Sequence, residues 1–335
     1  MPPTTIPLPL VKAAYLRQGM REVQGWLNPS TALYLSALEV LQRREQIDGD
    51  VCEIGVYHGK SFLTLALGLP EDQRAVAVDV FEDQHLNLDQ AGRGDRAILE
   101  SNLAKHRASA NVDIIKASSL ELDAVGFFKP GRRFRMFSID GSHTPEVTCN
   151  DLQVAEQTVV EQGIVALDDL LNPQWLGVVT GLFSYWAGGG SLVPYGVVPG
   201  KLLLATDLEQ ATMNRELIRR SFGDGMVKRD VPLGVHTVDV LGEFPWIVVD
   251  EEGGSDLLPG NHTAVAAVTK RTRTVPIAYL TQLEQRAAER DALIKARQSR
   301  PHRRVVRKLK RLARPAVRSG RTRIAALRAR RAKRT

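Results

Sequence analysis

The sequence predicts an α/β protein with a doubly wound, mostly parallel β-sheet, and three observations lead to this class. First, short apolar runs alternate with segments of helical periodicity from residue 49 to residue 187. Second, these runs show no polar–apolar alternation, which is typical of parallel strands covered by helices on both faces. Third, polar or acidic residues follow the ends of several runs. Together they predict repeated strand–helix units with a ligand site beyond the carboxyl ends of the strands.

The expected elements follow in order along the chain. Apolar residues at helical spacing predict two leading helices at 10–27 and 30–46, with Ser30 as the N-cap of the second. Strands of the parallel part are expected at 49–56, 74–81, 112–119, 133–140 and 163–169. Helices are expected at 60–69, 96–107, 145–162 and 173–187. Beyond residue 190 the pattern predicts an antiparallel ending, with a hairpin over 192–206, a helix over 208–222 and a final strand over 236–241.

The chain divides into four expected parts with very different charge. A helical cap spans 1–48, the sheet domain spans 49–249, a polar linker spans 250–278, and a basic helical or disordered tail spans 279–335. Residues 281–335 hold 20 of the 45 Lys/Arg but only 3 of the 38 Asp/Glu, so this segment carries +17. The remainder, with 25 basic and 35 acidic residues, carries −10. The formal net charge of +7 therefore originates in the tail.

Charge and composition also bear on partners and compartment. A segment such as 300–335 is expected to attract an anionic membrane surface, or else the phosphates of a nucleic acid. No aromatic residue lies beyond Tyr279 to stack on bases, which favours the lipid surface. No apolar run reaches the roughly 18–20 residues that a membrane span needs, and no signal peptide is expected. The two cysteines, Cys52 and Cys149, fit reduced thiols in a cytoplasmic protein, peripheral on the cytoplasmic membrane face through its tail.

A glycine-containing turn, EIGVYHGKS, follows the first parallel strand. Glycines there let the backbone approach a ligand, and the helix that follows offers free N–H groups. The spacing is G-x-x-x-G, which is neither the dinucleotide fingerprint G-x-G-x-x-G nor a phosphate-binding P-loop. Asp79 ends the second strand 24 residues after Gly55, where a carboxylate can accept hydrogen bonds from ribose hydroxyls. Ser118 and Ser119 end the third strand, so the three strand ends together predict an adenosine site.

Two further strand ends deliver carboxylates. FSIDGSHTPE places Asp140 and His143 after the fourth strand, and VALDDLLNP places Asp168 and Asp169 after the fifth, 28 residues later. Neighbouring strands lie about 4.8 Å apart, so the three carboxylates can converge. Clustered carboxylates repel one another unless a cation joins them, and Mg²⁺ prefers such oxygen ligands. The spacing therefore predicts a divalent-metal site formed by Asp140, Asp168 and Asp169.

Each of these residues also has an ordinary structural interpretation. Asp140 alone could be a turn residue, Asp168 and Asp169 could cap the next helix, and His143 could lie on the surface. Asp151 is expected to be solvated or to lie just outside the ligand groups. Three aromatic residues of the next helix are expected mainly in the core, with stacking on a sugar as the alternative: Trp175, Tyr185 and Trp186.

The motifs EIGVYHG, AVD, IDGSH and LDD resemble those of a class I S-adenosylmethionine (SAM) dependent methyltransferase over about residues 50–245. More narrowly, they resemble metal-dependent sugar O-methyltransferases of the macrocin type. The resemblance implies a Rossmann-like sheet of seven strands, with the methyl donor across the first two strands. It implies a donor site formed by Glu53, Gly55, Tyr57, Gly59, Ser61, Asp79, Ser118, Ser119 and Asp140.

The resemblance also implies the chemistry. Methyl transfer to a hydroxyl of a sugar or glycan-type small molecule would use Mg²⁺ or another divalent cation to activate the acceptor. His143, three residues after Asp140, would take the proton. Two other classes stay open: a nicotinamide-dependent enzyme on a similar sheet, and a non-catalytic adenosine-binding module tethered by its tail. A nucleic-acid methyltransferase is a third, weaker alternative that only the tail suggests. The sequence is also compatible with an oligomer.

Overall fold

The computed structural model describes residues 5–122, 127, 132–243, 248–251 and 254–257. All of them belong to one compact unit, Met1–Thr272. The expected tail over 279–335 lies outside the described residues, and so does most of the expected linker. Within the described part of the chain, no helix is long and apolar enough to cross a membrane.

Among the described residues the main sheet has nine strands, two more than the resemblance implies and one more than the eight expected from the apolar runs. The expected strand over 236–241 is present, but 226–233 forms a strand that the sequence did not predict because its side chains are mostly exposed. In spatial order the strands are β4 (Val112–Lys116), β3 (Ala75–Asp79), β2 (Asp50–Ile54), β5 (Phe134–Ile139), β6 (Val159–Asp168), β8 (Lys201–Ala205), β7 (Val193–Val198), β10 (His236–Leu241) and β9 (Met226–Leu233).

The direction of the strands confirms a mostly parallel sheet with an antiparallel ending. Strands β4, β3, β2, β5 and β6 pair in parallel, and β8 runs antiparallel to both β6 and β7. Strand β10 is parallel to β7 and antiparallel to β9. The strand order reverses between β2 and β5, which is where ligands bind in doubly wound sheets.

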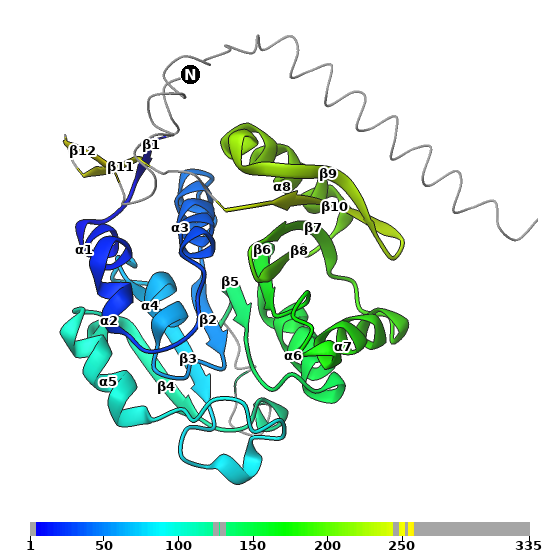
Figure 1. Ribbon diagram of the computed structural model, residues 1–335, viewed down its shortest axis with the longest axis horizontal. Helices are drawn as coiled ribbons and strands as arrows, with labels where there is room; N and C mark the ends of the chain where they lie inside the picture. Colours follow the sequence, from blue (N-terminus) through cyan, green and yellow to red (C-terminus); the bar gives the residue numbers. More distant parts are fainter. Residues whose placement is uncertain (1–4, 123–126, 128–131, 244–247, 252–253, 258–335) are drawn as a thin grey trace, which may run out of the picture. The chain divides into compact units, whose positions relative to one another are not determined.

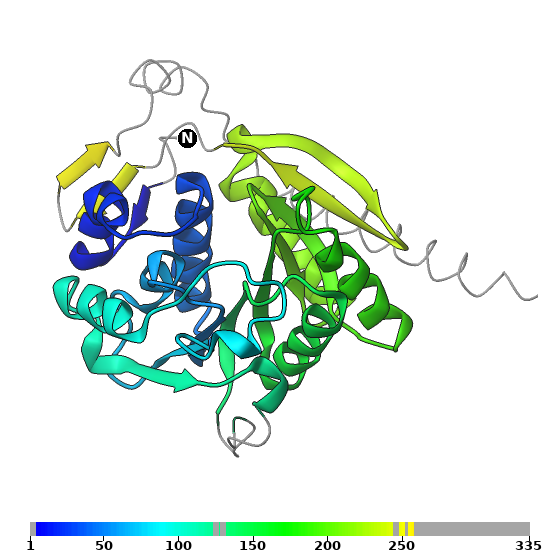
Figure 2. The same cartoon turned by 60° about the horizontal axis from the view of Figure 1, so that its bottom comes forward.

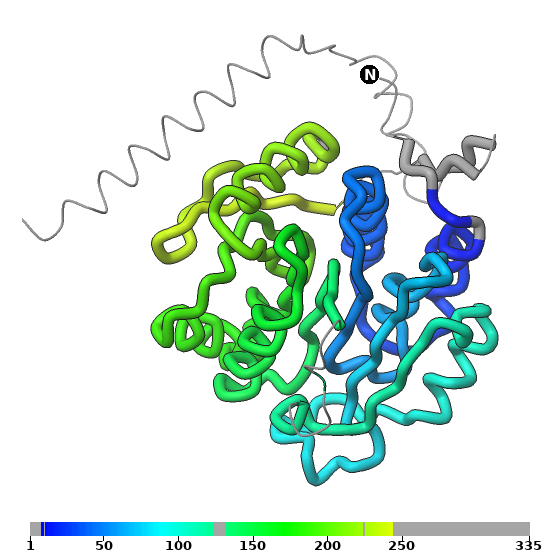
Figure 3. Tube along the Cα trace, turned by 180° about the vertical axis from the view of Figure 1, so that it is seen from behind, coloured from blue at the N-terminus to red at the C-terminus, as the bar shows by residue number. Residues whose placement is uncertain are grey.

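Helices cover both faces of the sheet, as expected. Buried side chains of α3, α4, α5 and α8 share one apolar cluster, whereas those of α6 and α7 share another on the opposite face. Figure 1 labels α6 and α7 near β5 and β6, and Figure 3 shows the layers from behind. The helices are α1 (Leu10–Ala14), α2 (Met20–Glu22), α3 (Pro29–Arg44), α4 (Lys60–Ala66), α5 (Arg96–Lys105), α6 (Pro145–Thr158), α7 (Leu176–Ala187) and α8 (Leu208–Ser221).

Short helical turns complete the described elements. The turn Tyr15–Gly19 is a π-helix between α1 and α2. Four 3₁₀ turns lie at Gln84–Leu86, Ser109–Asn111, Ser119–Glu121 and Gly223–Gly225. Helix α6 ends at Thr158 rather than near 162, because the chain already enters β6 at Val159.

The N-terminal helices differ from the expectation at two points. The first helical stretch ends at Glu22 rather than near 27, because Val23 is extended and Gly25 has a φ of 140° that few other residues adopt. Asn28, not Ser30, caps α3: the Asn28 side chain accepts the N–H of Ser30 at 2.8 Å, with Pro29 in the first turn. Proline lacks the N–H that the first turn leaves unpaired, so it fits there.

Buried charges tie the N-terminal helices to the sheet. Lys12 of α1 pairs with Glu39 of α3, and Arg135 of β5 lies 3.0 Å from the same carboxylate. All three side chains are at most 3% exposed. Removing one partner from such a group leaves an uncompensated buried charge. The segment before β2 is therefore part of the domain's core.

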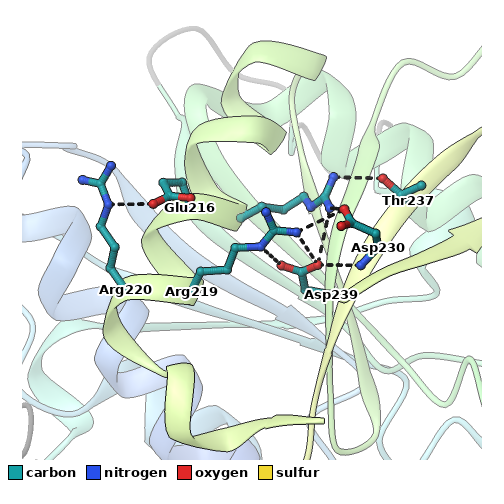
Figure 4. A network of polar contacts seen from close by, with 7 residues as sticks. Glu216, Arg219, Arg220, Asp230, Thr237 and Asp239 are labelled. Atoms are coloured by element: carbon teal, nitrogen blue, oxygen red, sulfur yellow. Dashed lines mark hydrogen bonds and ion pairs between the residues drawn. The ribbon is translucent and has the colours of Figure 1, made fainter. Parts of the chain in front are cut away.

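Helix α8 holds the two outer strands through ion pairs (Figure 4). Arg219 donates to both oxygens of Asp239 in β10, at 2.5 and 2.9 Å. Arg215 donates to Thr237 at 2.9 Å and also pairs with Asp230 of β9. The N–H of Asp230 reaches Asp239 at 3.0 Å. Two-pronged pairs of this kind are among the stronger hydrogen bonds. Arg215 and Arg219 also pair with Asp230, which ties β9 to α8. Figure 2 shows the yellow-green ribbons of β9 and β10 on the outer side of the sheet.

A separate small sheet has the order β1-β11-β12, with β1 at Thr5–Pro7, β11 at Val248–Glu251 and β12 at Gly254–Leu257. Strand β1 pairs in parallel with β11, which pairs antiparallel with β12. The start of the expected linker 250–278 is thus strand, contrary to the expectation. The polar, glycine-containing composition suggested a linker, but Val248–Glu251 and Gly254–Leu257 pair as antiparallel strands.

Candidate functional site

A cleft of about 640 Å³ lies beyond the carboxyl ends of the parallel strands. Its walls come from the turns after β2, β3, β4, β5 and β6, and from residues 25–28 before α3. Ten residues predicted from the sequence line it: Gly55, Tyr57, Ser61, Asp79, Ser118, Ser119, Asp140, His143, Asp168 and Asp169.

The geometry of the turn after β2 explains why its first residue has to be glycine. Gly55 has a φ of +83°, and a Cβ there would lie 1.8 Å from the carbonyl oxygen of Asp140. The chain at this point brings the ends of β2 and β5 together, and the N–H of Asp140 donates to Ile54 at 2.8 Å. Only glycine fits so close an approach. The next aromatic residue, Tyr57, has a φ of +49° and stacks on His58 with ring centroids 3.8 Å apart.

Asp79 lies at the end of β3 beside that turn. Its carboxylate accepts the N–H groups of Tyr57 at 2.8 Å and of Phe81 at 2.7 Å. Burial raises the pKa of Asp79, while these N–H groups favour the charged form. The backbone thus fixes the carboxylate at the cleft wall, where it can accept hydrogen bonds from the hydroxyl groups of a ribose.

A buried carboxylate lies behind the wall after β4. Asp151 of α6 was expected to be solvated or to lie just outside the ligand groups; it is fully buried and not solvated, and burial raises its pKa to about 7. Asn150 beside it donates to the carbonyl oxygen of Ser119 at 3.1 Å. A Cβ on Gly141 would lie 2.8 Å from Asp151 Oδ2. Asp151 therefore supports the wall that Ser118 and Ser119 form.

Two residues that were predicted to bind the methyl donor lie outside the cleft lining. Glu53 is fully buried and accepts the hydroxyl of Ser138 at 2.9 Å, so it lies beneath the cleft and not at its surface. Burial raises the pKa of Glu53. Gly59 has a φ of +91° and a Cβ there would lie 2.6 Å from Leu99 Cδ1. Before α4, glycine is needed for this backbone conformation and for packing against Leu99. The turn pattern in the sequence does not distinguish this need from contact with a ligand.

The ends of β5 and β6 converge as expected: the side chain of Asp168 contacts that of Asp140, and His143 lies with Asp140 and Asp169. Ligand atoms of Asp140, His143 and Asp169 all lie within 4.8 Å of one another. Two carboxylates and an imidazole are donors that a divalent cation such as Mg²⁺ or Mn²⁺ accepts, with the carboxylates suiting Mg²⁺ best. Desolvation and the neighbouring charge of Asp168 raise the pKa of Asp140 well above its usual range, which a bound cation would reverse. The residues therefore fit a divalent cation.

Asp168, the third expected ligand, is held by a lysine. Lys201 of β8 lies 2.6 Å from Asp168 Oδ2, and its side chain is 1% exposed. The other oxygen, Oδ1, accepts the N–H of Asp169 at 2.9 Å. Sequence reasoning missed Lys201, although a lysine at the start of the apolar strand KLLLA was a usable signal.

His143 is held between two carboxylates. Its Nδ1 lies 2.5 Å from Asp89 Oδ2, which also accepts the N–H of His143, and its Nε2 lies 3.1 Å from Asp169. Burial alone would lower the pKa of His143, but the hydrogen bonds with Asp169 and Asp89 raise it to about 9. Asp89 comes from an irregular loop, so no periodicity pointed to it.

Aromatic and amide side chains line the cleft beside this cluster. Trp175 stacks on His143 with ring centroids 4.3 Å apart, and Asn172 and Gln174 lie next to it in the lining. Trp26, which is 76% exposed, lines the cleft beside Tyr57. Of the aromatic residues expected in the core, Tyr185 is buried and Trp186 is partly buried. Trp175 is the one of the three that lines the cleft.

The strand order, the turn after β2 and the acidic residue after β3 are those that the resemblance to class I SAM-dependent methyltransferases implies. Residues 52–170 match the sequence model of a family described as a methyltransferase domain. The match covers the turns after β2, β3, β4 and β5 and reaches just past Asp169. No curated protein matches the sequence significantly.

Several solved structures are similar to part of this chain. TomG, an O-methyltransferase from Streptomyces achromogenes in complex with SAM, is 19% identical, with 61% of this chain and 92% of that chain covered and a TM-score of 0.42. An O-methyltransferase from Bacillus cereus in complex with SAH is 16% identical, covering 60% and 93%, with a TM-score of 0.43. CalS11, a TDP-rhamnose 3'-O-methyltransferase, is 18% identical, covering 59% and 87%, with a TM-score of 0.40.

Proposed function

We propose that this protein transfers a methyl group from SAM to a hydroxyl group of a sugar-type small molecule, assisted by a divalent cation. The observation that carries the proposal is the Asp140–His143–Asp169 cluster in the wall of the donor cleft. The donor would lie along the turns after β2, β3 and β4, with Asp79 toward its ribose and Ser119 toward its adenine. Trp175, Asn172 and Gln174 offer the aromatic and amide groups that suit a hydroxylated acceptor.

The reaction forms a carbon–oxygen bond and breaks the carbon–sulfur bond of the sulfonium, leaving neutral S-adenosylhomocysteine (SAH) and one proton. Asp140 and Asp169 would hold the cation, which when bound lowers the pKa of a coordinated hydroxyl. His143 would take the proton at Nε2, because Asp89 occupies Nδ1 and Trp175 fixes the ring. The pKa of about 9 means that the neutral imidazole is most populated at alkaline pH.

Titration of SAH into the full-length protein by calorimetry, with and without Mg²⁺, tests the donor site first. Micromolar binding supports the proposal, and a screen of hydroxylated glycosides for methyl transfer from SAM follows. His143→Ala should abolish turnover while SAH affinity stays within about threefold, since it lies on the acceptor side. Absence of SAH binding would return the nicotinamide-dependent and non-catalytic alternatives to consideration.

The basic tail supports a second, separate part of the proposal. Residues 281–335 carry +17, and within them residues 300–335 are expected to bind an anionic membrane surface, each basic residue contributing about 1 kcal/mol near the lipid. Full-length protein should pellet with phosphatidylserine vesicles at low salt and be released by high salt. Equal binding by a chain truncated after residue 280 would remove this idea, and methyl transfer into RNA that depends on the tail would replace it.

A further inference from the structure

Helix α7 has an outer face without charge. Of the α-helices that the structure describes, α7 alone contains no acidic or basic residue. From residue 170 to residue 206 the chain has one charged residue, Lys201, and its side chain is only 1% exposed. A helix that covers a sheet ordinarily presents charged residues to water. The surface that this stretch contributes to the domain is therefore uncharged.

Large apolar side chains are exposed on this outer face. Val178 and Leu182 of α7 are buried against the sheet, whereas Leu176 is 66% exposed and Phe183 is 43% exposed. Thr180, which is also exposed, lies between them. Residues spaced by four and three positions lie in one row along a helix. A single exposed apolar residue is ordinary, but a row of them marks a surface that binds something.

The hairpin between β9 and β10 extends the row. A Cβ on Gly234 would lie 3.5 Å from Phe183 Cε1 and 4.0 Å from Trp186 Cζ3. The ring of Trp186 lies 5.4 Å from that of Phe183 and 5.6 Å from that of His236. Val235, between Gly234 and His236, is 80% exposed. Together these side chains form one surface, which we call the α7 face: Leu176, Thr180, Phe183 and Val235.

The charge of the chain indicates which partner fits the α7 face. A twofold axis brings the same patch of two copies into contact, so a charged patch would meet its own charge. The chain outside residues 281–335 carries −10, and two such domains repel each other wherever acidic surfaces meet. The α7 face avoids this repulsion, and the cores of protein interfaces are likewise aromatic and poor in charge. An anionic lipid surface would instead select basic residues, which this face lacks.

We infer that the α7 face binds the same face of a second copy, so that the protein is a homodimer with twofold symmetry. Helix α7 begins directly after Trp175, which lines the cleft and stacks on His143. Packing of α7 against the partner therefore also fixes the end of the cleft that Trp175 lines. The inference does not depend on the proposed methyl transfer.

Sedimentation velocity of the full-length protein at micromolar concentration tests the inference. The expected species has twice the monomer mass of 37.0 kDa. Leu176→Glu and Phe183→Glu each place a carboxylate in the uncharged interface, so each should weaken the dimer by about tenfold or more. Met213→Glu is the matched control, because Met213 is 58% exposed on α8, a helix rich in charged residues. That variant should leave the dimer unchanged.

The same variants separate the other outcomes. Neither Leu176 nor Phe183 lines the cleft, so unchanged SAH affinity would show that a monomeric variant is folded. A monomeric unmodified protein would overturn the inference, as would a dimer that survives both substitutions. If Leu176→Glu instead lost binding to phosphatidylserine vesicles without a change in mass, the face would belong to a membrane contact and the inference would be wrong.

Discussion

Asp151→Asn should stabilise the protein more at pH 8 than at pH 5.5. The carboxyl group of Asp151 is fully buried, and burial raises its pKa to about 7 from an ordinary 3.8. The folded state therefore holds a proton that the unfolded state has lost between these two values. Stability consequently falls as pH rises from 3.8 to 7 and is constant above 7. Asparagine stays neutral, so the variant does not undergo this loss.

The size of the effect follows from the same pKa. Between pH 5.5 and its pKa of about 7, each pH unit changes the free energy of unfolding by about 1.4 kcal/mol. The gain from Asp151→Asn should thus be about 2 kcal/mol larger at pH 8 than at pH 5.5. Comparing the two gains cancels any pH-independent effect of fitting an amide into the site.

Urea unfolding of both proteins at the two pH values measures the difference. Asp239→Asn is the opposite control, because Arg219 helps to lower the pKa of Asp239 despite its burial. The Asp239 carboxylate is fully ionised above the usual carboxyl pKa. Asp239→Asn should therefore lower the free energy of unfolding by the same amount at pH 5.5 and pH 8. A gain from Asp151→Asn that does not change between the two pH values would refute the reasoning.

Three further predictions concern the cleft. Gly55→Ala should prevent SAH binding and destabilise the domain by several kcal/mol in urea unfolding, since its methyl group would overlap the Asp140 carbonyl; normal stability would contradict this. Asp79→Ala should weaken SAH binding at least tenfold by calorimetry, and unchanged affinity would place the ribose elsewhere. Asp89→Asn should lower kcat roughly 10²-fold or more with SAH affinity intact, because the histidine loses its orienting carboxylate. Asp83→Asn, in the same loop but paired with Lys116, is its control.

The parallel half of the fold could be predicted because most of its strands are apolar runs buried on both faces, although the edge strand β4 is only partly buried. Strand β9 could not, since an edge strand is exposed on one side and MVKRDVPL carries no apolar period. The N-terminal helix was predicted too long because apolar spacing continues past Glu22, while the turn at Gly25 depends on tertiary packing. The small sheet requires β1 to pair with β11, and at least 241 residues separate the two strands along the chain. No local sequence pattern can indicate such a pairing.

The candidate site was predictable where residues follow strand ends. Asp79, Asp140, Asp168 and Asp169 could be placed at one edge of the sheet from their positions alone. Their roles depend on neighbours that spacing does not reveal. Lys201 approaches Asp168 through an antiparallel strand 33 residues later, and that contact depends on register.

The edge strand β9 also bears on how copies of this protein can meet. A sheet that ends in a long regular strand offers its free N–H and C=O groups to another chain. Here that strand carries Lys228 and Arg229, a proline at Pro232 that cannot donate, and a positive φ of 53° at Asp230. Its pairing with β10 is irregular as well. Each feature opposes the addition of a further strand, so this edge is protected against sheet-to-sheet aggregation.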